Sequence, residues 1–209
     1  MNAQRLKLRG DLLPPSFYTS EDVVQLAQAL IGKVIVSLVD GKYCSGRIVE
    51  TEAYRAPEDK ACHAWNNRRT HRTATMFESG GVAYIYLCYG IHHLFNVVTG
   101  PKDKAHAVLV RAIEPLDNIP LMLQRRNMRS LHPNLTNGPG KWTQALGITT
   151  ALNGIKLYTP DAPIQLRDDG YTVAKDELLT GPRIGVDYAG EWAKVPWRFR
   201  LAQNAYIGP

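Results

Sequence analysis

Hydrophobic and polar positions follow two different periods along this chain. In the segment "FYTSEDVVQLAQALIG" the apolar residues recur at helical spacing and share one face: Val23, Ala27, Leu30 and Ile31. Thr19 is a suitable N-cap, acidic residues follow it, and Gly32 is a suitable stop. We therefore predict an architectural helix between Thr19 and Gly32, packed against the core.

The middle of the chain has the alternation of β-strands. "KVIVSLVD" and "YCSGRIVETEAY" surround an Asp-Gly turn, which predicts a hairpin. "GVAYIYLCYG" and "LFNVVTG" predict a second hairpin around a short loop, and "HAVLVRAIEP" predicts another strand. Strands joined by such short turns pair antiparallel.

The remaining segments add helices and strands in no regular alternation. Helices are predicted in "NIPLMLQRRNM" and "GPGKWTQALGI", later strands in "NGIKLY" and "APIQLRDDGYTV", and a final strand in "GPRIGVDYAGEWAKVPWRFRL". The chain shows no repeat, linker or low-complexity run. This order predicts one α+β domain over residues 1–209 with a mainly antiparallel sheet, and not a Rossmann fold.

Composition supports a folded domain. The chain has 209 residues, of which 44% are hydrophobic. No stretch is long and apolar enough to cross a bilayer, and the polar start "MNAQRLKLRGDLLPP" is unlike a signal peptide. Cys44, Cys62 and Cys88 lie far apart without a CxxC pair. We therefore expect an intracellular protein with reduced thiols.

The charge is basic, with a net charge of +6 and a pI near 9.3. Arginines cluster in "NRRTHRT" and in "QRRNMR", and guanidinium groups bind phosphate oxygens in a bidentate fashion. Many basic proteins carry only solvated lysines and arginines, so charge alone leaves nucleic-acid binding open.

Carboxylates interrupt the strand pattern of "IVETEAY". Strand alternation places Glu50 and Glu52 on one face with Ile48 and Tyr54, opposite the side that would pack on the core. A carboxylate inside a protein is costly unless it is paired or used, although a surface edge strand could simply turn both acids to water. Arg111 is equally isolated among aliphatic neighbours and could pair with Glu50, Glu52 or Glu114, in a structural or a catalytic role.

Aromatic residues gather in the second hairpin. Tyr84 and Tyr86 share a strand face, and Tyr89 stands beside its turn. Strand tyrosines usually pack between core and surface. A tyrosine at a hairpin tip of a basic protein can also wedge between base pairs.

Known catalytic motifs are missing. The histidines lack the HExxH and C₂H₂ spacings, and the chain has no Walker loop, GxGxxG, GxSxG or zinc-deaminase signature. The neighbouring Cys62 and His63 cannot be taken as a nucleophile–base pair from adjacency alone.

Several segments in order, however, carry a specific resemblance: "GRIVETEAY…PEDKACH", "NRRTHRTATMF", "YIYLCYGIHHLFNVV", "VLVRAIEP", "GPGKWTQALGI" and "GVDYAGEWAKVPWRF". Together they resemble the alkyladenine (3-methyladenine) DNA glycosylase family over residues 13–201. The resemblance implies a single compact domain with a curved, mainly antiparallel β-sheet, flanking helices and a protruding β-hairpin.

The resemblance also implies roles for individual residues. Glu52 matches the general base that activates the attacking water, and Arg111 matches the residue that holds this water and Glu52. The pocket walls that sandwich a flipped base match three residues: Tyr54, His63 and Tyr86. The main-chain N–H of His63 would read the edge of the base.

Further matches concern selectivity and DNA contact. Asn96 matches the residue that disfavours normal guanine by clashing with its exocyclic amino group. Tyr89 matches the residue inserted through the minor groove in place of the extruded nucleotide. The positions aligned with backbone contacts are Arg68, Thr70 and Lys141. The chain departs from the family pattern at Ala56, where a glycine is common, and in its pair of histidines at the hairpin turn.

The expected function is therefore that of a monofunctional DNA glycosylase of base excision repair. It would flip alkylated or deaminated purines (3-methyladenine, 7-methylguanine, hypoxanthine or ethenoadenine) out of double-stranded DNA and hydrolyse the N-glycosidic bond with water, without strand cleavage. We expect a cytoplasmic, nucleoid-associated monomer (nuclear in a eukaryote) with no cofactor, no metal and no membrane partner. A non-catalytic lesion binder and a purely structural domain are the alternatives.

Overall fold

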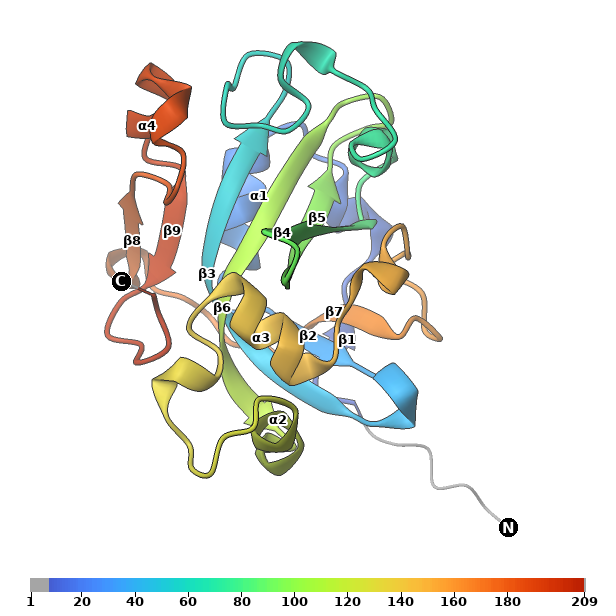
Figure 1. The fold of residues 1–209 in the computed structure, drawn as a ribbon, viewed down its shortest axis with the longest axis vertical. Helices are drawn as coiled ribbons and strands as arrows, with labels where there is room; N and C mark the ends of the chain where they lie inside the picture. The colour runs from blue at the N-terminus through green and yellow to red at the C-terminus, as the bar shows by residue number, and fades with distance from the viewer. Residues whose placement is uncertain (1–7, 209) are drawn as a thin grey trace.

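The alternating segments pair into one antiparallel sheet in the computed structural model, which describes residues 8–208. Its strands are β1 (Asp11–Leu12), β2 (Val34–Ser37), β3 (Cys44–Arg55), β4 (Ala83–Cys88), β5 (His92–Thr99), β6 (His106–Asp117), β7 (Ile164–Asp168), β8 (Leu178–Gly181) and β9 (Arg198–Leu201). They are ordered β1-β7-β2-β3-β6-β5-β4, and β9 pairs with β3 and β8 (Figure 1). The α+β class with a mainly antiparallel sheet is confirmed.

The helices are short: α1 (Val23–Leu30), α2 (Ile119–Arg125), α3 (Pro139–Leu146) and α4 (Glu191–Lys194). Helix α1 lies behind β3 and β6 in the view of Figure 1 and buries Val23, Ala27 and Leu30 in the main core. Helix α3 packs on β5 and β6 through Trp142, whose indole Nε1 donates to the Val110 carbonyl at 3.0 Å. No helix among residues 8–208 is long and apolar enough to cross a membrane.

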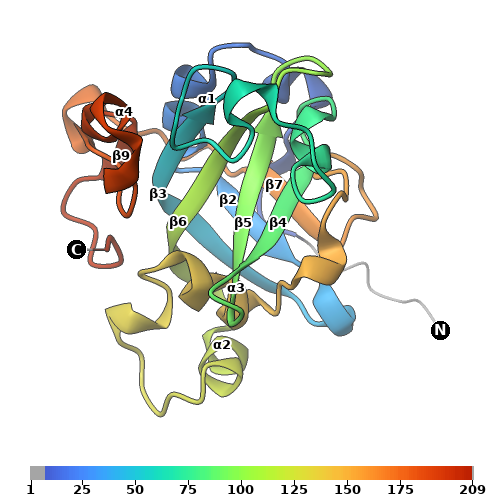
Figure 2. The ribbon, with the colours of Figure 1, turned by 45° about the horizontal axis from the view of Figure 1, so that its top comes forward.

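Strand β3 is a central strand of the sheet, and its partner on one side changes along its length. Its first part pairs with β2, whereas Glu50, Thr51 and Glu52 pair with β9, and β6 follows the other edge throughout. The β3–β6 register is irregular around Glu50, as expected where long paired strands coil and bulge. The result is the curved sheet visible in Figure 2. This curvature brings β9, from the end of the chain, beside the two acids of β3.

The first helix begins later than the sequence pattern predicted. Thr19 is not its N-cap, because Pro15–Tyr18 form a separate 3-10 turn and the Thr19 hydroxyl donates back to Ser16 O at 3.0 Å. Asp22 caps α1 by accepting the Gln25 N–H at 2.9 Å. The predicted buried face of the helix and its end before Gly32 are confirmed.

Both predicted hairpins are confirmed, as β2–β3 and β4–β5. The prediction of a strand in "NGIKLY" is wrong: this segment makes an isolated bridge between Lys156 and Val82. Ile155 and Leu157 make main-chain hydrogen bonds with the residues at the start of β4. The segment then turns away from β4, so the pairing does not continue as a β-ladder. Strands β1 and β8 were missed. The extent of the predicted domain over residues 1–209 stays a prediction.

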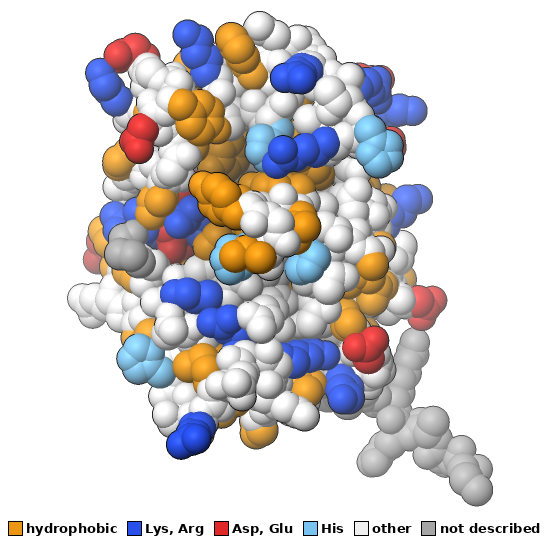
Figure 3. Space-filling view, viewed as in Figure 1, with side chains coloured by type: hydrophobic (Ala, Val, Ile, Leu, Met, Phe, Trp, Pro, Cys, Tyr) orange, Lys and Arg blue, Asp and Glu red, His pale blue; other side chains and the backbone are white. Residues whose placement is uncertain are grey.

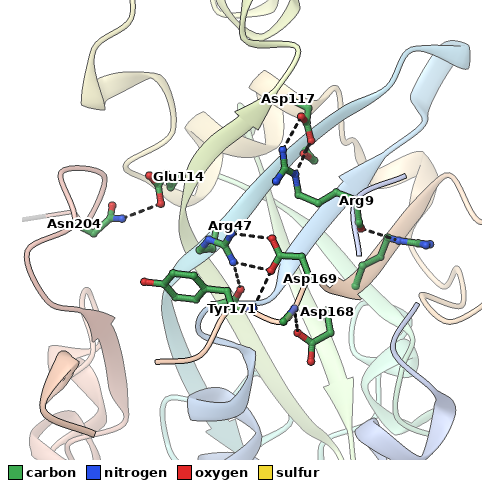
Figure 4. Close-up of polar contacts among 12 residues, drawn as sticks. Arg9, Arg47, Glu114, Asp117, Asp168, Asp169, Tyr171 and Asn204 are labelled. Carbon is green, nitrogen blue, oxygen red and sulfur yellow. Dashed lines mark hydrogen bonds and ion pairs between the residues drawn. The ribbon is translucent and has the colours of Figure 1, made fainter. Parts of the chain in front are cut away.

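Ion pairs tie β3 and β6 to the residues before β1 and after β7 (Figure 4). Arg9 binds both carboxylate oxygens of Asp117, at 2.9 and 3.0 Å. Arg47 binds Asp169 in the same bidentate way and lies 4.0 Å from the Tyr171 ring centroid. The hydrogen bond from Arg9 is the main cause that lowers the pKa of Asp117. The first pair joins the residues before β1 to the end of β6, and the second joins β3 to the turn after β7.

Candidate active site

One row of paired residues crosses the sheet at the base of the candidate site. Tyr84 on β4 stands opposite Asn96 on β5, Asn96 opposite Leu109 on β6, and Leu109 opposite Glu52 on β3. Residues paired in this way project from the same face of the sheet. Antiparallel register therefore brings together an acid, an amide and a phenol that lie far apart in the sequence.

A cavity of about 620 Å³ opens over this row. Seven of the predicted site residues line it: Tyr54, His63, Tyr86, Tyr89, Asn96, Arg111 and Lys141. In Figure 3 hydrophobic side chains gather near the centre of this face, and lysine and arginine side chains lie above and below them. The volume is in the range of small-molecule sites in proteins.

Glu52 lies directly beneath the lining of the cavity and does not contribute to it. Its side chain has 0% exposure. One oxygen, Oε2, accepts the Tyr54 hydroxyl at 2.7 Å. The other, Oε1, accepts the Ile184 main-chain N–H at 2.8 Å and lies 3.3 Å from Arg111 Nη1. All three partners line the cavity, so the alternative of an acid turned to bulk water is wrong.

Arg111 lies between the two acids of β3. Its Nε donates to Glu50 Oε1 at 3.0 Å while its Nη1 faces Glu52, and Glu114 instead accepts the amide of Asn204. Burial disfavours the guanidinium charge, but Glu52 and then Glu50 outweigh it and raise the pKa of Arg111 above its ordinary value. The arginine therefore stays charged at the edge of the cavity.

Aromatic rings form one wall of the cavity. The rings of His63 and Tyr86 meet edge to face at 4.7 Å, and the Tyr84 hydroxyl lies 3.0 Å from His63 Nδ1. Burial, and secondarily the charge of Arg72, lowers the pKa of His63 to about 4. Burial likewise raises the pKa of Tyr84 to about 12. At neutral pH this wall is therefore uncharged.

Tyr54 and Asn96 are held by bonds to the framework. The Tyr54 pKa is raised well above its ordinary value by burial and by the neighbouring Glu52, so its hydroxyl keeps its proton and donates to the carboxylate. Asn96 is buried, and its Nδ2 donates to the Tyr84 carbonyl at 3.0 Å. This bond sets the orientation of the amide at the cavity.

The predicted DNA-contact residues are less uniformly placed. Tyr89, at the tip of the β4–β5 hairpin, is 91% exposed and has a φ of 51°. Lys141 lines the cavity and donates to Asn134 and Asn137. Arg68 is exposed and Thr70 bonds to Thr73, but neither reaches the cavity.

Three residues that were not assigned to the site from the sequence also contribute to it. Arg72 lines the cavity with its guanidinium 5.1 Å from the Tyr86 ring centroid; its signal was membership of the arginine cluster. Arg183 and Asp59 form a buried bidentate pair at 2.6 and 2.8 Å. Arg183 also lies 4.7 Å from the Tyr54 ring centroid and immediately precedes Ile184. No local pattern connects two residues so distant in the chain.

Metal ligands do not cluster here: among residues 8–208, no three histidine, cysteine, aspartate or glutamate side chains are grouped to hold a metal ion. The three cysteines are free thiols.

Comparison with known proteins gives a consistent match. The model of the methylpurine-DNA glycosylase family matches residues 16–205. A protein of Chlamydia pneumoniae named "Putative 3-methyladenine DNA glycosylase" is 52% identical over 192 residues, covering 91% of this chain and 95% of that protein. A protein of the same name from Bacillus cereus (strain ATCC 10987 / NRS 248) is 45% identical over 200 residues, covering 93% and 97%.

Proposed function

This chain belongs to the methylpurine-DNA glycosylase family and is a DNA glycosylase, a hydrolase of N-glycosidic bonds, and we propose that it excises alkylated or deaminated purines from duplex DNA with an activated water. The proposed substrates are 3-methyladenine, 7-methylguanine, hypoxanthine and ethenoadenine. The product would be an abasic site in an uncut strand, because attack by water requires no lysine Schiff base.

The observation that carries this proposal is the buried carboxylate of Glu52, held by Tyr54, Ile184 and Arg111 at the floor of the cavity. Breaking an N-glycosidic bond develops positive charge on the sugar. A fixed carboxylate stabilises such charge and can accept a proton from a water. This chemistry needs one essential carboxylate, in contrast to the pair used by ordinary glycosidases.

The proposed reaction follows from these contacts. A water held by Arg111 gives a proton to Glu52 as its oxygen bonds to C1′ of the deoxyribose. The bond between C1′ and the purine nitrogen breaks, and its electron pair leaves with the base. To accept the proton, Glu52 Oε2 exchanges its present donor, the Tyr54 hydroxyl, for the water, while Arg111 stays on Oε1.

The aromatic wall suits a positively charged base. Purines alkylated at N3 or N7 are cationic, and an aromatic face attracts a cation by about 0.5–2 kcal/mol. Because the low pKa of His63 leaves it neutral at pH 7, His63 does not repel such a base. Tyr54, His63 and Tyr86 would enclose the flipped ring, and the His63 main-chain N–H would read its edge.

Asn96 is proposed as the selectivity residue. Its amide is buried at the cavity and fixed by the Tyr84 carbonyl, so it cannot move aside without losing that bond. A normal guanine would bring its 2-amino group against this amide, whereas adenine derivatives and hypoxanthine carry a hydrogen at that position. 7-Methylguanine keeps the 2-amino group, but its positive charge makes it a better leaving group, which offsets the unfavourable contact.

Access to the cavity requires the nucleotide to leave the duplex. Flipping costs a few kcal/mol of stacking and pairing. Tyr89, exposed at the hairpin tip, is proposed to fill the gap in the stack. Arg68, Thr70 and Lys141 would contact the phosphates, with the strong salt dependence expected of such contacts.

The Tyr89→Ala variant tests the wedge. Stacking of a base on an aromatic side chain is worth about 1–3 kcal/mol, so we expect affinity for a lesion duplex to fall by about tenfold or more. Excision from a single-stranded oligonucleotide with the same lesion should change little, since no gap needs filling. Equal losses of activity on both substrates, or no loss of affinity for the duplex, would contradict the wedge role of Tyr89.

A panel of duplexes with one defined lesion each tests the function itself. We expect free purine to be released from at least one lesion in a metal-free buffer with chelator, with the strand left intact until alkali is added. Binding of lesion DNA without release would indicate a non-catalytic lesion binder. Equal affinity for damaged and undamaged DNA at matched salt would contradict both readings.

A further inference from the structure

Glu50 is a buried carboxylate that the proposed reaction does not use. Its side chain is 1% exposed, and it does not line the cavity. Oε1 accepts hydrogen bonds from Arg111 Nε at 3.0 Å and from Arg198 Nε at 2.6 Å. Oε2 accepts the main-chain N–H of Gly208 at 3.0 Å.

These contacts connect the end of the chain to the floor of the cavity. Arg198 stands opposite Glu52 in the β3–β9 pairing, and its Nη2 donates to the Gly208 carbonyl at 3.3 Å. Glu50 therefore joins three segments: β9, the residues after it, and β6 through Arg111. Glu50 and Glu52 therefore have different surroundings although they lie on one face of β3. Glu52 lies at the floor of the cavity, whereas Glu50 binds β9 and the residues that follow it.

The guanidinium of Arg111 is held at two of its three nitrogens. Nε is bound by Glu50 and Nη1 faces Glu52 at 3.3 Å. Within residues 8–208, Nη2 has no hydrogen-bond partner, although Arg111 lines the cavity and its side chain is 13% exposed. Because the guanidinium is planar and rigid, fixing Nε determines where Nη1 and Nη2 point.

We propose that Glu50 is a positioning residue for base excision, which sets the plane of Arg111 so that one nitrogen holds Glu52 and another meets the attacking water. This inference rests on the proposed function. Without Glu50, Arg111 would have Glu52 as its remaining carboxylate partner and could turn to bind it with two nitrogens, the geometry that arginine and carboxylate prefer. That turn would withdraw Nη2 from the cavity and occupy the Glu52 oxygen that the water needs.

The Glu50→Gln variant tests the proposal. Glutamine has one acceptor oxygen in place of two, so its NH₂ group must face either the arginines or the Gly208 N–H. A misplacement of about 1 Å in a catalytic group can cost about 10²-fold in rate. We expect single-turnover excision to slow by about 10- to 100-fold, with the dissociation constant for lesion DNA unchanged within a few-fold.

A double-variant cycle separates positioning from general structural support. If Glu50 acts through Arg111, the Glu50→Gln/Arg111→Met protein should excise no more slowly than Arg111→Met alone. A further drop in the double variant would assign Glu50 a role independent of Arg111 and overturn the proposal. Excision by Glu50→Gln at the wild-type rate would overturn it as well.

Glu114→Gln is the matched control. Glu114 is a partly buried acid on β6 whose contact is with Asn204, and its loss should leave excision unchanged. If Glu50→Gln does not fold, Glu50→Asp retains the charge but has a shorter reach. We expect it to be slower than wild type by about tenfold, and a wild-type rate would again contradict the proposal. If wild-type protein releases no base at all, the proposed function fails instead.

Discussion

Exchanging Glu52 for glutamine is expected to lower the rate of base release by about 10²–10⁴-fold, the contribution typical of a positioned general base. The change removes the acceptor of the water's proton and the negative charge beneath the sugar, while its volume and shape stay nearly the same. Single-turnover excision on a duplex with one 3-methyladenine analogue or hypoxanthine would measure it. The affinity for that duplex should change little, because Glu52 lies under the lining and touches the cavity through Tyr54, Ile184 and Arg111.

Two measurements make this result specific. The thermal unfolding of Glu52→Gln should remain cooperative, which excludes a collapsed site as the cause of lost activity. Its binding to lesion DNA should persist in the same salt. An excision rate equal to that of the wild type would reject the base role of Glu52, whatever the affinity.

Replacing Asp59 by asparagine is expected to lower the free energy of unfolding by about 3–5 kcal/mol, because it leaves the charge of Arg183 buried without its partner. Both side chains are 0% exposed, and the two hydrogen bonds between them measure 2.6 and 2.8 Å. Arg183 also donates to the carbonyls of Ala53 and Trp192. Urea unfolding monitored by tryptophan fluorescence would measure the loss.

The same fold contains a matched exposed pair. Glu191 and Lys194 are joined at 2.9 Å, but their side chains are 86% and 75% exposed. Such surface pairs contribute about 0–1 kcal/mol, so Glu191→Gln should have little effect. Equal costs for Glu191→Gln and Asp59→Asn would show that burial does not set the strength of the Asp59 pair.

A second variant separates the charge from the packing at this position. Asp59→Asn/Arg183→Met removes both charges, and we expect it to be more stable than Asp59→Asn alone, since a buried pair can often be exchanged for apolar residues at little cost. It should nevertheless excise more slowly than wild type. Arg183 precedes Ile184, whose N–H binds Glu52, and its guanidinium faces the Tyr54 ring.

Local pattern was a good guide wherever one element decided the outcome. From Val49 onward, the alternation in "IVETEAY" separates the side of Val49 and Ala53, both buried in the main core, from the side of Glu50 and Glu52. It fails for Ile48, which was grouped with the acids but also lies in the main core, because the β3–β6 register is irregular between Ile48 and Glu50. The hairpin around Tyr89 follows from two strands and a short turn. Errors arose where local signals competed: Thr19 has the chemistry of an N-cap, but the preceding turn already occupies its hydroxyl.

The sequence by itself determined the two hairpins, the hairpin tip and the face on which the acids lie, because side-chain direction in a strand depends on position alone. Resemblance to a family added roles for residues such as Glu52 and Tyr89, and these roles remain for experiment. Only the tertiary structure decided that both acids are buried, that Arg111 lies between them, and that Asp59 meets Arg183. Periodicity states which way a side chain points but not which distant strand lies opposite, and burial and ion pairing depend on that partner.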